Sequence, residues 1–376
     1  MTDRVRVGIV GCGDIAFRRY LPGFATIEDQ AVIAGFYDRD SARSAAAVAA
    51  YGASAYESMD ALLADPTIDA VLNLTPPKHH VPVSSAVLDA GKHLLTEKLM
   101  ANTLDEADLL IAQARRADRV FVCAPAVAIS PFMVDLRRLL HGGAIGRVLG
   151  ARAQLSTFGP AGWREYTSDP TWFYEEGAGP LADLGVYPLH MLTELLGPVR
   201  RVSAMASISL PTRTVLYGPA AGKEISVGVA DNVQMLLDFT DGDAPKTIAS
   251  LDSTYCAWAT TGPHLEIYGT DGALVVNSIY DDTGTIRMWR AGGDGAWSTA
   301  PRISSDDLPT RGLYIFGGAA HLVECIQRGL PPLLTGEHAR HVLDVILTAG
   351  RAARDGVTLD VQTSFDYPKD WEAFGQ

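Results

Sequence analysis

The chain has 376 residues, of which 47% are hydrophobic, so it is long enough and apolar enough to build the cores of two domains. Its formal net charge of −13 at pH 7 and its lack of long basic runs argue against a surface for nucleic acid or anionic membranes. No apolar stretch reaches the length of a membrane span, and the first residues lead into a strand rather than a signal peptide, which predicts a cytoplasmic protein.

A β-branched strand at residues 5–10 is the first predicted element, and it leads into a turn of pattern G-x-G-x-x-A and a helix as far as Phe24. In this pattern the first glycine permits the tight turn, the second lets a pyrophosphate approach the backbone, and the small last residue lets the helix pack closely on the strand. The N–H groups of the first helical turn would hold the phosphates. The predicted cofactor residues here are Gly11, Gly13, Asp14, Ile15 and Ala16.

The second strand, residues 31–37, ends at Asp38. A carboxylate at this point can accept both ribose hydroxyls of NAD and repel a 2′-phosphate. The alternative, that Asp38 is a turn residue capping the helix from Ser41, stays open. We therefore expect NAD as the cofactor, and because Arg39 lies beside Asp38, NADP is the second option.

Strands and helices then alternate in the manner of a doubly wound sheet. The predicted strands are residues 69–75, 93–96 and 120–124, and the predicted helices are 80–90 and 104–117, the latter with a capping box formed by Thr103 and Glu106. The sequence pattern changes near Pro125. This change predicts a cofactor-binding domain at residues 1–125 and a substrate-binding and oligomerisation domain at 126–376.

The second domain shows longer alternating runs, at residues 148–156, 226–238, 246–253 and 264–268, with turn signals at Asp241-Gly242 and Asp271-Gly272. These patterns indicate antiparallel sheet. Two late helices, at about residues 315–328 and 337–353, complete the chain and are expected to pack back on the first domain. The predicted fold class is therefore α/β, an N-terminal doubly wound domain followed by an α+β domain with a large, mostly antiparallel open sheet.

Glu97 and Lys98 end the predicted strand at residues 93–96. In open α/β sheets ligands bind beyond the carboxyl ends of the strands, so this charged pair is expected to face the cofactor rather than the core. A solvated lysine at a strand end is the alternative for Lys98 taken alone.

Four motifs carry a resemblance to a known family: the glycine-rich turn, Thr75-Pro76-Pro77-Lys78-His79-His80, Ala90-Gly91-Lys92-His93 with Glu97-Lys98, and Gly179-Pro180-Leu181-Ala182-Asp183-Leu184-Gly185-Val186-Tyr187. In order and spacing they resemble the glucose-fructose oxidoreductase / inositol dehydrogenase / rhizopine-catabolism (Gfo/Idh/MocA) family. The resemblance implies a Rossmann domain for NAD or NADP, and hydride transfer between nicotinamide and the carbinol or ketone of a sugar or polyol. It also implies that Thr75, Pro76, His80, Glu97 and Lys98 contact the cofactor.

The resemblance assigns the chemistry to Lys98, which matches the lysine of the family's Glu-Lys-Pro motif. Its ammonium would bond the reacting oxygen, stabilise developing alkoxide charge and shuttle the proton. Glu97 would orient the lysine or face the ribose. This chain has Leu99 where proline is usual, and because bonds before residues other than proline are almost never cis, any special bend at Lys98 is expected to be absent or made differently.

A second catalytic cluster is predicted on a helix that starts near Leu184, where spacings of four and three place Asp183, Tyr187 and His190 on one face. Tyr187 stands where glucose-fructose oxidoreductase-like members carry tyrosine, so it is the expected acid/base partner of Lys98, whose ammonium would favour the phenolate. Asp183 is expected to bind a substrate hydroxyl or organise the site. His190 is either a supporting donor or a satisfied core histidine.

Further substrate contacts are expected from Trp163, Arg164 and Trp172, in a loop rich in aromatic residues. Such rings suit the apolar face of a sugar, although they would equally anchor the loop on the sheet. Ala126 and Ala128 predict a pocket wall of low polarity, which argues against a carboxylated or phosphorylated substrate.

No metal site is predicted, because the adjacent His79 and His80 point in different directions and no cluster of cysteine or carboxylate residues joins them. The scattered cysteines are expected to be reduced core thiols; they are Cys12, Cys123, Cys256 and Cys325.

A dehydrogenase acting on a sugar-like alcohol is the favoured function, and an NAD-dependent glycosidase that oxidises its substrate transiently or a non-catalytic dinucleotide sensor are the alternatives. The expected partners are a small sugar or polyol and further copies of the chain. Alternation places Val233, Met235 and Leu237 on one face of the sheet, and too few helices are predicted to cover both faces. A homodimer or homotetramer that buries the outer face is therefore expected.

Overall fold

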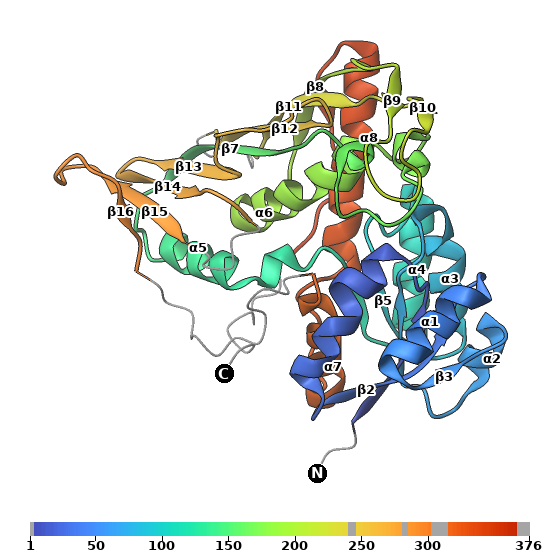
Figure 1. The fold of residues 1–376 in the computed structure, drawn as a ribbon. Coiled ribbons are helices and arrows are strands. Elements are labelled where there is room, and N and C mark those ends of the chain that lie inside the picture. Colours follow the sequence, from blue (N-terminus) through green and yellow to red (C-terminus); the bar gives the residue numbers. More distant parts are fainter. Residues whose placement is uncertain (1–3, 240–245, 280–284, 302–314, 367–376) are drawn as a thin grey trace. The chain divides into compact units, whose positions relative to one another are not determined.

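The computed structural model describes residues 4–239, 246–279, 285–301 and 315–366. The chain divides into two compact units. The first unit comprises Met1–Ala126 and Leu313–Leu343, and the second comprises Val127–Gly312 and Asp344–Gln376. Figure 1 gives the elements of each unit along the sequence.

The first unit is built on a six-stranded sheet in the order β3-β2-β1-β4-β5-β6, all of it parallel. Its strands are β1 (Val5–Val10), β2 (Ala31–Tyr37), β3 (Ser54–Ala55), β4 (Ala70–Asn73), β5 (His93–Thr96) and β6 (Phe121–Cys123). The strand order reverses between β1 and β4, which opens a crevice at their carboxyl ends where such sheets bind ligands. The doubly wound sheet predicted from the sequence is confirmed.

The helices of this unit follow from local signals in the sequence. They are α1 (Ser41–Tyr51), α2 (Met59–Ala64), α3 (His80–Asp89), α4 (Leu104–Ala117) and α7 (Gly317–Arg328). The Thr103 hydroxyl accepts from the N–H of Glu106, and the Glu106 carboxylate accepts from the N–H of Thr103, so the predicted capping box is present. The helix after the glycine-rich turn differs from the regular one expected, because it is wound as a π-helical turn (Ala16–Tyr20) and a 3-10 helix (Leu21–Ile27).

The late segment of the first unit packs on its early strands and helices. The ring of Phe316 lies edge-on to that of Phe24, with 5.3 Å between centroids. The N–H of Cys123 donates to the carbonyl of Leu334 at 3.1 Å. These contacts make α7 and the chain that follows it part of the same core as the parallel sheet.

The second unit is built on a nine-stranded sheet in the order β16-β15-β14-β13-β7-β12-β11-β8-β17. Its strands are β7 (Val148–Ser156), β8 (Arg201–Ser207), β11 (Asn232–Asp238), β12 (Ile248–Thr254), β13 (Leu265–Gly269), β14 (Gly272–Val276), β15 (Ile286–Arg290), β16 (Ser298–Thr299) and β17 (Leu359–Asp360). Among the described strands of this sheet only β7 and β12 pair in parallel, which confirms a large, mostly antiparallel sheet.

The single strand expected at residues 226–238 is wrong. A separate two-stranded sheet of β9 (Thr212–Thr214) and β10 (Glu224–Ser226) ends first, and β11 begins at Asn232. The backbone between them forms hydrogen bonds with other loops: the N–H of Val227 donates to the carbonyl of Pro211, and the N–H of Gly228 donates to the carbonyl of Tyr174. The Asp271-Gly272 turn joins β13 to β14, whereas Asp241-Gly242 lies outside the described residues.

Helices α5 (Pro131–His141) and α6 (Val186–Leu196) cover one face of this sheet (Figure 1). Val233, Met235 and Leu237 are buried within the chain, so they mark the covered face. The alternate residues form the open face, where Met205 is 82% exposed and Leu236 is 55% exposed. The apolar stripe noted in the sequence therefore belongs to the core of this unit.

The last long helix, α8 (Gly336–Asp355), has residues in both units. In the second unit its Asp344 carboxylate accepts from the backbone N–H groups of Gln362 and Thr363, both at less than 3 Å. A search of the described helices finds none that is long and apolar enough to cross a membrane.

Candidate functional site

The glycine-rich turn lies at the carboxyl end of β1, where the strand order reverses. Gly11 has φ +96°, and a Cβ atom there would lie 2.8 Å from the backbone of Leu74, so only glycine fits this approach of β1 to the chain after β4. Of the described residues, only the Arg43 guanidinium lies within 4 Å of a Cβ built at Gly13, at 3.9 Å. The open space over Gly13 fits the pyrophosphate of a dinucleotide.

The residues after the turn begin the helix. Asp14 accepts from the Arg18 guanidinium at 2.7 Å, so its carboxylate is held in an ion pair one helical turn away. Ile15 is half-buried and Ala16 is fully buried. A small residue at Ala16 lets this helical turn pack closely.

Asp38, at the end of β2, braces the same turn. One carboxylate oxygen accepts from the N–H of Cys12 at 2.8 Å and the other from the N–H of Asp40 at 2.9 Å. Because both bonds come from the backbone, the carboxylate fixes the end of β2 against the glycine-rich turn. Asp38 therefore has a structural task beside the ribose contact that the sequence predicted.

Basic residues lie next to Asp38 in the sequence and over the glycine-rich turn. Arg39 is exposed, and burial together with the cations of Lys78 and Arg39 lowers the pKa of His79. Sequence reasoning missed Arg43, in the first turn of α1, whose guanidinium lies over Gly13. Arg43 follows the end of β2 by six residues, but no pattern in the sequence placed its guanidinium over Gly13.

His80 is buried between two carbonyl groups. Its Nδ1 lies 2.6 Å from the carbonyl oxygen of Leu99 and its Nε2 lies 2.7 Å from that of Thr75. Burial lowers the pKa of His80, and the two carbonyl groups oppose that shift. The Thr75 hydroxyl donates to Asn73 at 2.6 Å, so the chain from β4 through Pro76 to His80 is held as one unit with the end of β5.

Glu97 is buried and Lys98 is half-buried at the end of β5. The Glu97 carboxylate accepts from the hydroxyl of Tyr20 at 2.7 Å and from the N–H of Lys98 at 3.0 Å. The peptide bond between Lys98 and Leu99 is cis, at the position where the sequence has leucine in place of the usual proline. Sequence reasoning missed Tyr20, and no pattern linked it to Glu97.

In the second unit, Asp183 lies in a π-helical turn, Leu181–Gly185, that leads into α6. The helix thus begins earlier than the predicted start near Leu184. A Cβ atom at Gly185 would lie 2.7 Å from Leu181 and 3.1 Å from Ser253, and the Ser253 hydroxyl donates to the carbonyl of Pro180 at 2.8 Å. The turn therefore packs directly on β12, and this packing fixes the position of Asp183 relative to the end of that strand.

Asp183 is bonded to a residue that the sequence did not single out. The hydroxyl of Tyr255 donates to its Oδ2 at 2.9 Å. Tyr255 is fully buried, and burial followed by the charge of Asp183 raises its pKa well above the usual value. Tyr187 and His190 are also buried, on α6.

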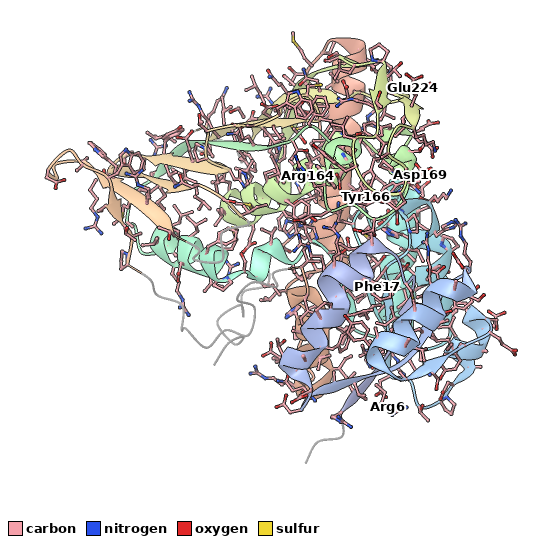
Figure 2. The ribbon with its side chains drawn as sticks, viewed as in Figure 1. Arg6, Phe17, Arg164, Tyr166, Asp169 and Glu224 are labelled. Carbon is pink, nitrogen blue, oxygen red and sulfur yellow. The ribbon has the colours of Figure 1, made fainter. Side chains whose placement is uncertain are left out.

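The aromatic loop is anchored by its own rings. The indole N–H of Trp163 donates to the Thr157 hydroxyl at 3.3 Å, and that of Trp172 donates to the Tyr166 hydroxyl at 3.2 Å. Arg164, labelled in Figure 2 near Tyr166, is exposed and lies over the ring of Tyr217 at 4.5 Å. These contacts support an anchoring role for the two indoles.

Two expectations drawn from the sequence concern buried residues. Ala126 and Ala128 are buried, and a pocket wall of low polarity at these positions stays a prediction. The four cysteines are free thiols; Cys12, Cys123 and Cys325 are buried, and Cys256 is half-buried. Within the part of the chain that the structure describes, no group of three or more histidine, cysteine or carboxylate residues is arranged to hold a metal.

Comparison with known proteins identifies the family. The model described as "Oxidoreductase family, NAD-binding Rossmann fold" matches residues 5–124, and the model for the Gfo/Idh/MocA C-terminal domain matches residues 133–275. The chain is 31% identical to dTDP-3,4-didehydro-2,6-dideoxy-alpha-D-glucose 3-reductase of Streptomyces violaceoruber over 281 residues, 73% of each chain. It is 26% identical to levoglucosan dehydrogenase of Pseudarthrobacter phenanthrenivorans over 233 residues, 57% of each chain.

The fold also matches solved structures. Aldose-aldose oxidoreductase from Caulobacter crescentus, complexed with glycerol, superposes with a TM-score of 0.78 at 24% identity, over 95% of this chain and 100% of that one. This likeness shows the fold, and the sequence relatives carry the assignment further. The chain belongs to the Gfo/Idh/MocA family, and it is an NAD-binding oxidoreductase of that family.

Proposed function

We propose that this oxidoreductase transfers a hydride between NAD and the carbinol or ketone carbon of a sugar, polyol or related cyclic alcohol. The observation that carries the proposal is Lys98, half-buried at the carboxyl end of β5 and held through its backbone by the buried Glu97. Strand β5 is the neighbour of β4, which flanks the crevice of the dinucleotide site. An ammonium at this point suits an oxygen on which negative charge develops.

The residues then divide the work. The bound nicotinamide supplies or accepts the hydride. Lys98 holds the reacting oxygen and stabilises its developing charge, Tyr187 exchanges the proton with that oxygen, and Asp183 accepts from a neighbouring hydroxyl of the substrate. This division is supported by the family assignment and by the way each unit fixes its own residues.

The names of the relatives support a sugar substrate. One relative is a reductase of a dTDP-linked keto sugar and another is a dehydrogenase of levoglucosan, an anhydrosugar. Both names describe oxidoreductases that act on sugars. We therefore place the substrate of this chain among pyranose-like rings and assign the acceptor role of Asp183 to a ring hydroxyl.

An activity screen tests the function. The protein, stripped of cofactor, is incubated with NAD or NADP and levoglucosan, D-glucose, D-xylose or myo-inositol, and with NADH or NADPH and keto sugars. We expect a net change in nicotinamide absorbance with at least one sugar. Release of an aglycone from a glycoside without net NADH would replace the dehydrogenase by a glycosidase, and binding of dinucleotide without any turnover would indicate a sensor.

The open face of the nine-stranded sheet supports a second proposal, assembly into a homodimer or homotetramer. Besides Met205 and Leu236, Ile248 is 50% exposed on this sheet. Burial of such side chains between two sheets would be favourable. Light scattering at micromolar concentration is expected to return at least twice the chain mass of 40.2 kDa, and a mass equal to one chain would contradict the proposal.

A further inference from the structure

We propose that Tyr255 is a positioning residue that holds the Asp183 carboxylate in the orientation in which it accepts from the substrate. The inference rests on the proposed function, because it deepens the role given there to Asp183. It starts from one contact, the bond of 2.9 Å from the Tyr255 hydroxyl to Oδ2 of Asp183. Asp183 is half-buried and Tyr255 is fully buried, so the bond reaches from the core to the edge of the site.

The position of Tyr255 follows from the one parallel pair among the described strands of its sheet. Strands β7 and β12 run side by side in the same direction, so the chain segments that follow them leave the sheet at the same edge. Tyr255 follows β12 directly, and Phe158 and Gly159 follow β7. The turn that carries Asp183 packs on β12 at this edge, through Gly185 and Ser253.

The backbone of Tyr255 is fixed by a buried ion pair. Its N–H donates to the carbonyl of Asp231 at 2.8 Å, and its carbonyl accepts from the Arg213 guanidinium at 2.8 Å. Arg213 and Asp231 bond each other at 2.7 Å, with side chains 2% and 1% exposed. A buried pair of this kind persists only when its remaining bonding capacity is used, and here part of it is used on Tyr255.

The ring of Tyr255 is fixed by close packing. A Cβ atom at Gly159 would lie 2.8 Å from that ring and 2.8 Å from the Tyr174 hydroxyl, and Gly159 has φ +80°, so a side chain is excluded here. The rings of Tyr174 and Tyr255 meet edge to face, with 5.5 Å between centroids. With backbone and ring both fixed, the hydroxyl of Tyr255 points at Asp183 and has little freedom to turn away.

The hydroxyl also keeps its proton. Burial and the nearby carboxylate raise the pKa of Tyr255 well above its usual value, so the phenol remains a donor throughout the working pH range. Asp183 is therefore always the acceptor in this pair. A carboxylate held in this way keeps one orientation without having to find it when the substrate binds, and such preorganisation lowers the cost of binding.

Paired substitutions test the inference. Tyr255→Phe and Tyr174→Phe each remove one buried hydroxyl and keep the ring. The Tyr174 hydroxyl, however, accepts from the N–H of Ala161 at 3.0 Å, whereas the Tyr255 hydroxyl donates to Asp183. Steady-state kinetics on a sugar that the wild type turns over are measured together with Tm, with the sugar varied at saturating NAD and NAD varied at saturating sugar. We expect Tyr255→Phe to raise KM for the sugar roughly 5- to 50-fold, as for a lost bond to a charged group, with KM for NAD unchanged.

We expect Tyr174→Phe to lower Tm while KM for the sugar stays within about twofold, since it only leaves one buried N–H without its acceptor. Adding Tyr255→Phe to Asp183→Asn should worsen KM no further, because the tyrosine acts through the aspartate. If Tyr255→Phe keeps the wild-type KM for the sugar while Asp183→Asn raises it, the inference about Tyr255 is overturned and the role proposed for Asp183 stands. Wild-type KM in Asp183→Asn overturns the inference together with the role proposed for Asp183.

Discussion

Two strand edges of this molecule position functional groups by different means. At the edge of the first sheet, beyond β1 and β4, the work is done by backbone: the left-handed Gly11, the space over Gly13 and two N–H groups that hold Asp38. At the edge of the second sheet, beyond β7 and β12, side chains from distant segments converge, and the Arg213–Asp231 pair supports Tyr255. Both edges are the carboxyl ends of adjacent parallel strands.

This difference between backbone and side-chain positioning fits the ligand proposed for each edge. A dinucleotide presents the same pyrophosphate and ribose in every enzyme that uses it, and backbone N–H groups with a short glycine-rich turn suffice for it. A sugar is recognised through the positions of individual hydroxyls, which requires side chains of fixed orientation.

The largest effect is expected at Lys98, the group of the first unit that is proposed to act on the substrate. Lys98→Met should lower kcat by about 10²–10⁴ with NAD affinity little changed, and Tyr187→Phe should cost a similar or smaller factor. Their combined effect should be less than additive because both serve one oxygen. Steady-state kinetics and NAD titration measure this, with His190→Ala expected to cost far less. Near-normal turnover in Lys98→Met would remove it from the chemistry.

The supporting pair of the second edge should dominate stability. Arg213→Met leaves Asp231 buried without its cation and is expected to lower the free energy of unfolding by about 3–5 kcal/mol. The matched control is Arg201→Met, since Arg201 pairs with Asp238 in the nine-stranded sheet but is exposed, and its loss should change stability little. Equal Tm values for the two variants in thermal unfolding would show that the buried pair is not what fixes this edge.

The two edges also differ in how far the sequence revealed them. Gly11, Gly13 and Asp38 were predicted because their geometry is local: a strand, a turn and the next strand end, all within a few tens of residues. The Glu97–Lys98 pair and the capping box at Thr103 were found for the same reason. By contrast, Arg43 was missed although it lies close in sequence, because its reach over Gly13 depends on the angle between α1 and the turn.

Tyr255 was missed for a deeper physical reason. Alternating patterns indicated strands at residues 148–156 and 246–253, but alternation does not tell whether neighbouring strands run parallel. Without the parallel pairing of β7 and β12, nothing in the sequence brings Tyr255 to Asp183, which lies 72 residues away. The predicted strand at 226–238 was also too long, since Val227 and Gly228 bond to other loops rather than to the ladder.

A smaller effect is expected from pH, through the core of the first unit. Nε2 of His321 accepts from the N–H of Leu333 at 2.8 Å, and burial lowers the pKa of His321 from 6.5 to about 4. The unfolded chain therefore takes up a proton that the folded one rejects, so stability is complete above pH 6.5 and falls as the pH drops toward 4. His321→Gln, whose amide oxygen can still accept, should remove about 2 kcal/mol of the loss between pH 7 and pH 5. Denaturant unfolding at both pH values measures this. If the free energy of unfolding falls as much between pH 7 and pH 5 in His321→Gln as in the wild type, the prediction is contradicted.

The smallest effect is expected at Asp38, whose carboxylate is held by two backbone N–H groups. Asp38→Ser removes the charge that repels a 2′-phosphate and leaves Arg39 and Arg43 nearby, so the ratio of kcat/KM for NAD over NADP should fall by about tenfold. Arg43→Ala in the same background should reverse part of that change, because its guanidinium lies over the glycine-rich turn. A wild-type enzyme that prefers NADP would contradict the discriminating role of Asp38 and leave it as a brace for the N–H groups of Cys12 and Asp40. The first edge would then select its cofactor by side chains as well. Recognition by backbone groups would be left only for the pyrophosphate, and the two edges would otherwise work alike.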